Sequence, residues 1–308
     1  MQVVHGYDHV PREARRAVLA IGNFDGVHRG HQVLLARAKD IATPLKARAG
    51  VLAFEPHPRT LFQPERPLFR LTSITQRIAL FQQFGMDLAV VLPFDRTLAE
   101  LTAEAFIERV LVAGLGLRHA VIGFDFHFGK GRGGSPASLQ AAGHEMGFGV
   151  TIVAPVAEGG EVVSSSAIRA ELAQGDVAGA AHLLGHPWRV SGEVKGGAKR
   201  GTGMGYPTAN IGLPPGTALA HGIYAVRVHV GGKVHQGAAY LGTRPTFDNG
   251  DAVLETFLLD YDGDLYGRMI ELEFIDFIRG DRKFESTEAL VAQMDRDVAA
   301  TRQRLTRS

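Results

Sequence analysis

Apolar and polar positions alternate between two patterns over the first 185 residues of the chain. Short apolar runs, which are typical of buried parallel strands, lie at 17–21, 50–54, 88–92, 120–122 and 150–153. Longer segments with helical spacing lie between them, at 32–41, 74–84, 103–112 and 136–146. Strands that alternate with helices predict an α/β domain, Rossmann-like and doubly wound, with helices on both faces of a parallel sheet.

The pattern changes after Pro187. Alternating strands are predicted at 224–230, 233–241, 253–260 and 269–277, separated by glycine-containing turns. This pattern predicts an antiparallel sheet or small closed β-barrel. A final helix is expected over 286–305, with Ser286 as its N-cap. We therefore expect two domains of different class, at residues 1–186 and 187–308.

Composition narrows the classes of function. The chain has 308 residues, a formal net charge of +1 and no cysteine, which excludes disulfides, thiolate catalysis and cysteine-based zinc sites. The balanced charge gives no support for nucleic-acid binding. Residues 1–16 lack the apolar core of a signal peptide, and no apolar run reaches the length of a membrane helix. The expectation is a cytoplasmic protein without a membrane or nucleic-acid partner, monomeric or weakly oligomeric.

Residues 22–31, Gly-Asn-Phe-Asp-Gly-Val-His-Arg-Gly-His, follow the first strand and open the first helix. Parallel sheets bind ligands at this edge, and the free amides of a helix N-terminus attract anions. The loop's glycines let phosphate oxygens approach the backbone. His28 and His31 are three residues apart, so they share a helix face and can both donate to one polyphosphate. The pattern predicts a nucleotide-phosphate site.

Other interpretations of this loop remain open. It can be a plain glycine turn with two surface histidines, or the two histidines can bind a metal ion, although no third ligand is obvious nearby. A P-loop kinase is disfavoured because the loop lacks the lysine and Ser/Thr of a Walker A motif.

The loop resembles the His-x-Gly-His signature of the nucleotidyltransferase superfamily, and its longer form resembles that of bacterial FAD synthetases. Similar motifs follow at 54–59, 123–129 and 164–169. The resemblance implies catalytic roles for His28, His31 and Arg169. It also implies ATP or phosphate binding by Gly22, Phe24, Gly26, Gly30, Ser164 and Ser165, and flavin binding by Asp125, Phe124, Phe126 and Phe128.

These assignments also make physical sense. Asp125 at a strand end can accept a hydrogen bond from a flavin while neighbouring aromatic rings stack, although such rings can equally pack in the core. Arg169, one turn into a helix, can reach a pyrophosphate leaving group. Two residues depart from the family pattern: Ser166 replaces the usual threonine, and His127 stands where arginine is common.

A second unusual stretch is the glycine-rich, basic loop at 192–206, which leads into Pro-Thr-Ala-Asn at 207–210. Lys199 and Arg200 supply positive charge for phosphates, and Gly205 permits their close approach. Thr208 and Asn210 are neutral oxygen donors two residues apart, so in a strand they share a face and can meet one Mg²⁺ ion. Taken alone, the loop can also be a solvated hairpin.

The Pro-Thr-Ala-Asn string resembles the signature of riboflavin kinases, which carry ATP and Mg²⁺ there on a small β-barrel. The segments 242–247 and 258–267 also look like that family. Glu255 stands at the family's catalytic-base position, where a carboxylate accepts the proton of a primary hydroxyl. Thr202 departs from the pattern, because arginine is common there.

The two resemblances together imply a bacterial bifunctional riboflavin kinase/FAD synthetase. It would phosphorylate riboflavin to FMN with ATP and Mg²⁺, and then adenylylate FMN to FAD with release of pyrophosphate. A narrower hypothesis is that only one site is active, since Thr202 replaces an arginine in the kinase. A non-enzymatic alternative is a flavin-binding or regulatory module.

Overall fold

A computed structural model describes residues 1–195, 208–243 and 252–307, without the side chains of Glu158 and Arg307. The chain forms two compact units. The first contains Met1–Leu68 and Thr72–Ser164, and the second contains Phe69–Leu71 and Ser165–Ser308. Among the described residues no helix has both the length and the apolar character needed to cross a membrane.

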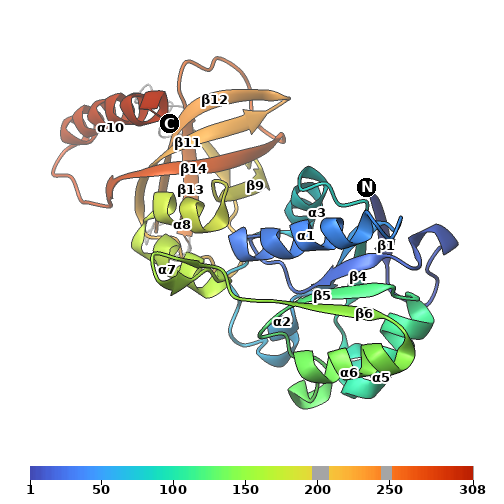
Figure 1. The fold of residues 1–308 in the computed structure, drawn as a ribbon. Helices are drawn as coiled ribbons and strands as arrows, with labels where there is room; N and C mark the ends of the chain where they lie inside the picture. The colour runs from blue at the N-terminus through green and yellow to red at the C-terminus, as the bar shows by residue number, and fades with distance from the viewer. Residues whose placement is uncertain (196–207, 244–251, 308) are drawn as a thin grey trace. The chain divides into compact units, whose positions relative to one another are not determined.

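The first unit contains a six-stranded, fully parallel sheet in the order β1-β4-β3-β2-β5-β6. Figure 1 labels β1, β4, β5 and β6 of this sheet, with helices such as α1 and α6 beside it. Its strands are β1 (Gln2–His5), β2 (Val18–Ile21), β3 (Ala49–Glu55), β4 (Leu88–Pro93), β5 (His119–Gly123) and β6 (Gly149–Val153). The order reverses at β2, which is the topological switch point where such sheets bind ligands at the strands' carboxyl ends. This confirms the predicted Rossmann-like, doubly wound domain.

Helices cover both faces of this sheet because successive side chains of a strand point to opposite sides. Val18 and Ala20 of β2 pack in one core with α1 (Arg29–Ala42) and with Phe81 of α3 (Ile74–Gln83). Leu19 and Ile21 pack in a second core on the other face. That core includes residues of η2 (Phe106–Gly114) and α6 (Pro136–Met146).

Two elements differ from the sequence-based expectation. The edge strand β1 was not predicted, because only Val4 of its four residues is buried and its pattern is therefore weak. The helix expected at 103–112 begins as α5 (Ala103–Ala105) and continues as the π-helix η2. Arg15 donates two hydrogen bonds to the carbonyl oxygens of Ala113 and Gly114 at its end, which satisfies groups that a helix end leaves open.

The second unit contains a six-stranded antiparallel sheet in the order β10-β13-β12-β11-β14-β9. Its strands are β9 (Arg189–Glu193), β10 (Thr208–Ile211), β11 (Gly222–Val230), β12 (Lys233–Thr243), β13 (Ala252–Leu258) and β14 (Met269–Gly280). The sheet also closes on itself between its edge strands β9 and β10. The amide of Lys195, which follows β9, donates to the carbonyl oxygen of Asn210 in β10 at 2.9 Å. The predicted small barrel is therefore confirmed.

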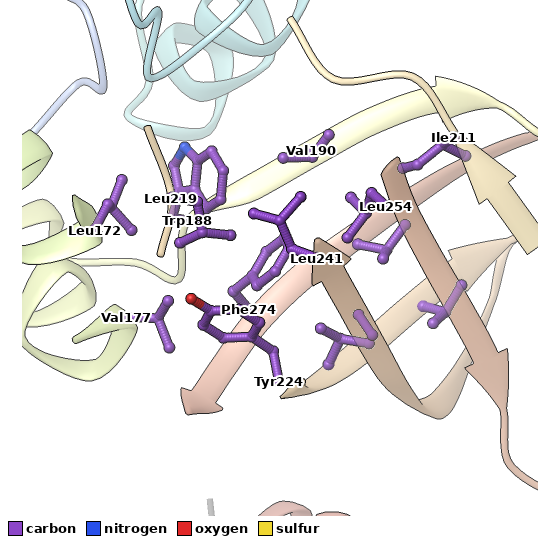
Figure 2. Close-up of a cluster of buried hydrophobic side chains, with 14 of the residues drawn as sticks. Leu172, Val177, Trp188, Val190, Ile211, Leu219, Tyr224, Leu241, Leu254 and Phe274 are labelled. Atoms are coloured by element: carbon purple, nitrogen blue, oxygen red, sulfur yellow. The ribbon is translucent and has the colours of Figure 1, made fainter. Parts of the chain in front are cut away.

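The core of this unit is centred on Trp188, which is 2% exposed. Its ring packs on Phe274, which in turn meets Tyr224 edge-on (Figure 2). The Trp188 indole donates to the Leu71 carbonyl oxygen at 3.0 Å, and Phe69 packs edge-on against the same indole. A short segment from early in the chain is thereby built into the second unit's core.

The described part of the second unit also contains helices α7 (Ser165–Gln174), α8 (Val177–Leu184) and α10 (Thr287–Arg307). Leu172 and Val177 contribute to the core from α7 and α8 (Figure 2). Helix α10 is capped by Ser286, as predicted, and Arg279 pairs with its buried Asp297. The remaining short elements among the described residues are η1 (Arg12–Ala14), α2 (Pro58–Phe62), α4 (Arg96–Ala99), η3 (Lys130–Arg132), β7 (Ala157–Glu158) and β8 (Glu161–Val162).

Candidate active sites

The loop at 22–31 connects β2 to α1, so it lies at the carboxyl edge of the sheet. His28 is the N-cap of α1, and its Nδ1 accepts a hydrogen bond from the His31 amide at 3.3 Å. The two imidazole rings are stacked with centroids 3.6 Å apart. Because Nδ1 of His28 accepts, its Nε2 carries the proton of the neutral ring and can donate to a phosphate oxygen. The structure thus brings the two predicted histidines together.

The backbone of this loop adopts left-handed conformations at three of four consecutive residues. The φ angles are 53° at Phe24, 87° at Gly26 and 43° at Val27. Glycine tolerates this region, but a β-branched residue such as valine does so only under constraint. Each residue other than glycine in this region lowers the stability of the folded state by about 1–3 kcal/mol, and strain of this kind is concentrated at functional sites.

The predicted phosphate-binding residues of the loop differ in their surroundings. The Phe24 ring is fully buried against Phe81 and lies beside the His31 ring. Only the backbone of Phe24 is therefore available to a phosphate. A Cβ atom added to Gly30 would lie 3.2 Å from the His28 ring, so glycine there leaves room for the stacked imidazoles. Gly22 donates its amide to the Leu52 carbonyl oxygen.

Buried Arg77 on α3 supports the loop at 22–31 through hydrogen bonds to its backbone and to that of β3, and it was not predicted from the sequence. Its guanidinium donates to the Asn23 carbonyl oxygen at 2.8 Å and to the Phe54 carbonyl oxygen at 3.4 Å, and it pairs with Glu55. A fully buried arginine needs such partners to offset its desolvation. The only signal in the sequence was a charged residue on the apolar side of a predicted helix.

Electrostatics favours a neutral His31. Burial lowers the pKa of His31 well below the usual value of 6.5, and its electrostatic interactions with His28 and Arg77 lower it further. A neutral imidazole next to anionic phosphates acts as a hydrogen-bond donor or acceptor rather than as an ion.

The predicted flavin-binding residues after β5 fall into two groups. Phe124 is 47% exposed and Asp125 is exposed beside it. Phe128 is buried, stacks on Phe126 and contacts Phe106 in the core. The first two are therefore accessible to a ligand as the structure stands, whereas Phe128 contributes to packing.

An exposed aromatic residue lies at the end of α2, and it was missed. Phe62 is 65% exposed and meets the Phe94 ring edge-on, and Phe94 meets Phe54 at the end of β3 in the same way. Its signal in the sequence was a phenylalanine three residues after the motif at 54–59. The carboxyl edge of the sheet thus carries a small aromatic surface.

The motif at 164–169 lies where the first unit passes into the second. Ser164 is the last residue of the first unit, and Ser165 begins α7. Arg169 on α7 donates from Nε to the Phe69 carbonyl oxygen at 2.6 Å, within the second unit.

The barrel's predicted site residues lie on two paired strands. Asn210 of β10 is the register partner of Glu255 of β13, and Thr208 is the partner of Phe257. Ala209 and Ile211 are buried, whereas Thr208 and Asn210 are only half-buried. The side chains of Thr208 and Asn210 therefore lie on the outer face of the barrel, together with the carboxylate of Glu255. One oxygen of this carboxylate is buried. Lys199, Arg200, Thr202 and Gly205 lie outside the described residues.

Tyr240 extends this row onto the next strand, β12. It is the register partner of Glu255, and its hydroxyl donates to Asp281 at 3.2 Å. A Cβ atom on Gly242 would lie 1.9 Å from the tyrosine oxygen, so the glycine leaves space for that hydroxyl. This row of Asn210, Glu255 and Tyr240 was not visible in the sequence, because register decides it.

The donor set of the barrel fits a magnesium ion held jointly with a nucleotide. Among the described residues no three His, Asp or Glu side chains gather as a metal cluster. Thr208 and Asn210 instead offer neutral oxygens beside one carboxylate. Mg²⁺ is commonly held by few protein ligands, with phosphate oxygens and water completing its shell.

Comparison with curated proteins gives similarity along nearly the whole chain. The bifunctional riboflavin kinase/FMN adenylyltransferase of Pseudomonas fluorescens is 42% identical over 98% of this chain and 97% of its own. The proteins of the same name from Escherichia coli K12 and Bacillus subtilis are 40% and 35% identical, over 97% and 96% of this chain and 96% and 95% of theirs. A crystal structure from Streptococcus pneumoniae, described as a macrolide-efflux protein, is 30% identical with a TM-score of 0.87, covering 97% of this chain and 98% of that one.

The fold and the matched families define a transferase with two activities. The FAD synthetase family model matches residues 10–167, and the riboflavin kinase family model matches residues 184–305. The chain therefore belongs to the family of bifunctional riboflavin kinase/FMN adenylyltransferases, as the motifs predict.

Proposed function

We propose that this chain makes both flavin cofactors, with Glu255 serving the first reaction and the His28–His31 pair the second. The chain is an enzyme of flavin cofactor biosynthesis that phosphorylates riboflavin to FMN and adenylylates FMN to FAD, with ATP as donor. The observation that carries the residue assignment is the placement of Glu255 directly opposite Asn210 on the barrel.

In the kinase reaction the ribityl 5′-hydroxyl of riboflavin attacks the γ-phosphate of ATP. Glu255 accepts the proton of that hydroxyl as the new bond forms, and ADP leaves. Thr208 and Asn210 would hold Mg²⁺, which neutralises charge on the phosphates when bound. Lys199, Arg200 and Gly205 are proposed to contact the phosphates of the same nucleotide, on the strength of the sequence.

In the adenylyl transfer the FMN phosphate attacks the α-phosphate of a second ATP, and pyrophosphate leaves. The nucleophile is already an anion, so the site needs alignment and charge stabilisation rather than a strong base. His28 and His31 would donate to the phosphates from the start of α1, where helix dipole and free amides add attraction. Arg169 is assigned to the leaving pyrophosphate, with Ser164, Ser165 and the loop glycines as further contacts.

On the flavin side we assign Phe124 and Asp125 to the isoalloxazine of FMN, because both are exposed at the end of β5. Phe126 and Phe128 would support that surface from within. The adenylyltransferase domain is proposed to comprise residues 1–186 and the kinase domain 187–308. A cytoplasmic location, a monomeric or weakly oligomeric state and the absence of a nucleic-acid partner stay predictions.

The test is a time course with riboflavin, ATP and Mg²⁺ that separates riboflavin, FMN and FAD by chromatography. The intact chain should form FMN first and FAD after it. His28→Ala should stop FAD formation and let FMN accumulate at the original rate, while exposed His144→Ala on α6 serves as the matched control. Loss of both activities in His28→Ala would contradict the two-site assignment.

The same assay separates the alternatives. If only the adenylyltransferase is active, FAD forms from supplied FMN but not from riboflavin. If the chain is a flavin-binding module, neither flavin supports ATP turnover.

A further inference from the structure

The loop at 22–31, called the phosphate loop below, is held in its strained shape by a residue from a distant part of the chain. Thr72 immediately precedes Ser73, the N-cap of helix α3, and is 6% exposed. Its amide donates to Oδ1 of Asp25 at 3.1 Å, and its Oγ1 lies 3.4 Å from the same oxygen. Its Oγ1 also accepts the Gly26 amide at 2.9 Å. One threonine therefore contacts two consecutive residues of the loop through three hydrogen bonds.

These contacts are made in the part of the loop where the backbone angles are unusual. Asp25 and Gly26 lie between Phe24 and Val27, the two side-chain-bearing residues of this loop with positive φ. Unusual backbone angles persist only where surrounding contacts over-determine them. Asp25 is 1% exposed, so its carboxylate is held by the protein and not by water.

The hydroxyl of Thr72 has both of its hydrogen-bonding roles in use. It donates its proton toward Asp25 and accepts the proton of a buried backbone amide, as a hydroxyl with one donor and two acceptor positions allows. Replacing it with a methyl group would leave the Gly26 amide without this acceptor in a buried position. The loss of a hydrogen bond at a buried amide is unfavourable, so the loop would relax away from this shape.

The beginning of α3 supports the loop at a second point as well. Arg77, five residues after Thr72, donates to the Asn23 carbonyl oxygen at 2.8 Å. Thr72 and Arg77 together hold residues 23, 25 and 26, immediately before His28. The segment that leads into His28 is therefore held by contacts from residues far from it in sequence.

We propose that Thr72 and Asp25 form a brace that keeps the phosphate loop in its nucleotide-binding shape, so that Thr72 is a positioning residue for adenylyl transfer. The inference rests on the assignment of the loop to the second ATP. Thr72 touches no substrate in this scheme and acts through the backbone of Asp25 and Gly26.

The test compares Thr72→Val, Thr72→Ser and Ser73→Ala in the full-length chain, with both activities measured. Thr72→Val keeps the shape and removes the hydroxyl. It should raise the KM for ATP in FMN adenylylation and lower kcat/KM by about 10- to 100-fold, the effect of misplacing groups in a reacting site. Riboflavin phosphorylation should stay within twofold of the unaltered chain. Thr72→Ser restores the hydroxyl and should recover most of the loss.

Ser73→Ala is the matched control, because it alters the neighbouring residue without touching the brace. Ser73 caps α3 by accepting the Gln76 amide at 3.2 Å, so its loss destabilises the same segment. We expect lower thermal stability but an unchanged KM for ATP. An equal rise in KM in Ser73→Ala would show general destabilisation and overturn the brace.

Other outcomes are also decisive. Adenylylation within twofold of normal in Thr72→Val, or no recovery in Thr72→Ser, overturns the proposal. If Thr72→Val does not fold, Asp25→Asn replaces it as the test, because the asparagine keeps a weaker acceptor oxygen. Asp25→Asn should raise the KM for ATP by a smaller factor, and an unchanged KM would count against the brace. If His28→Ala also leaves adenylylation intact, the assignment of the loop itself fails, which separates the two proposals.

Discussion

Asn210 and Glu255 face each other across the antiparallel pair of β10 and β13. Their neighbours Ala209 and Thr256, also register partners, point into the barrel and are buried. The amide and the carboxylate are thereby confined to the outer face. Asn210, which is suited to hold a nucleotide-bound cation, and Glu255, which is suited to accept a proton, therefore form one cross-strand pair. The Cβ atoms of such a pair are about 5 Å apart.

Replacing Glu255 with glutamine should lower the kcat of riboflavin phosphorylation by about 10²- to 10⁴-fold, the typical contribution of a general base. FMN adenylylation should be unchanged, since it needs no base from the barrel. Initial rates of FMN and FAD formation measure both effects. Glu271→Gln on β14, which alters a glutamate paired with Arg189, is the matched control. A kcat within tenfold of normal in Glu255→Gln would remove this carboxylate from the role.

Removing the amide of Asn210 should make the kinase depend more strongly on magnesium. Asn210→Ala deletes one proposed oxygen ligand, so the Mg²⁺ concentration for half-maximal FMN formation should rise by at least about tenfold, the lower range for losing a metal-site contact. Titrating Mg²⁺ at fixed ATP measures it. Ser191→Ala, on the outer face of β9, serves as the control. A rate reduced equally at every Mg²⁺ concentration would contradict the ligand role.

His31 should make the folded state sensitive to mild acid. Its pKa is lowered in the folded protein, so between that pKa and the unfolded value near 6.5 only the unfolded chain binds the proton. The free energy of unfolding therefore falls as pH drops below about 6.5, by at most about 1.4 kcal/mol per pH unit for this one group. His31→Asn should flatten this dependence.

Urea unfolding of both proteins between pH 7.5 and 5.5, followed by circular dichroism, measures the difference. Identical slopes for His31→Asn and the unaltered chain would show that His31 is not the group responsible.

Trp188→Phe should destabilise the second unit by about 1–3 kcal/mol. The change removes the donor to the Leu71 carbonyl oxygen and leaves a gap in a fully packed core. Thermal unfolding followed by circular dichroism suits this variant, because the chain has one tryptophan and loses its fluorescence signal. Tyr266→Phe, at an exposed position, is the control. An unchanged unfolding temperature would show that the indole hydrogen bond contributes nothing.

The sequence by itself determined the class of both sheets and the place of the phosphate loop. Period-two and period-3.6 patterns depend on local side-chain geometry, so strands such as β4 and helices such as α6 follow from hydrophobic spacing alone. That His28 and His31 lie on one face likewise follows from their spacing at a helix start, whereas the stacking of their rings was seen only in the structure. The family motifs then indicated which chemistry each site serves.

Only the tertiary structure decided which distant residues support those motifs. Strand register placed Tyr240 beside Glu255, and the packing of α3 placed Thr72 and Arg77 against the phosphate loop. Neither follows from local pattern, because register and helix docking depend on contacts between segments far apart in the chain. The single-residue pattern also could not separate exposed Phe124 from buried Phe128, since a phenylalanine suits a core and a stacking surface equally.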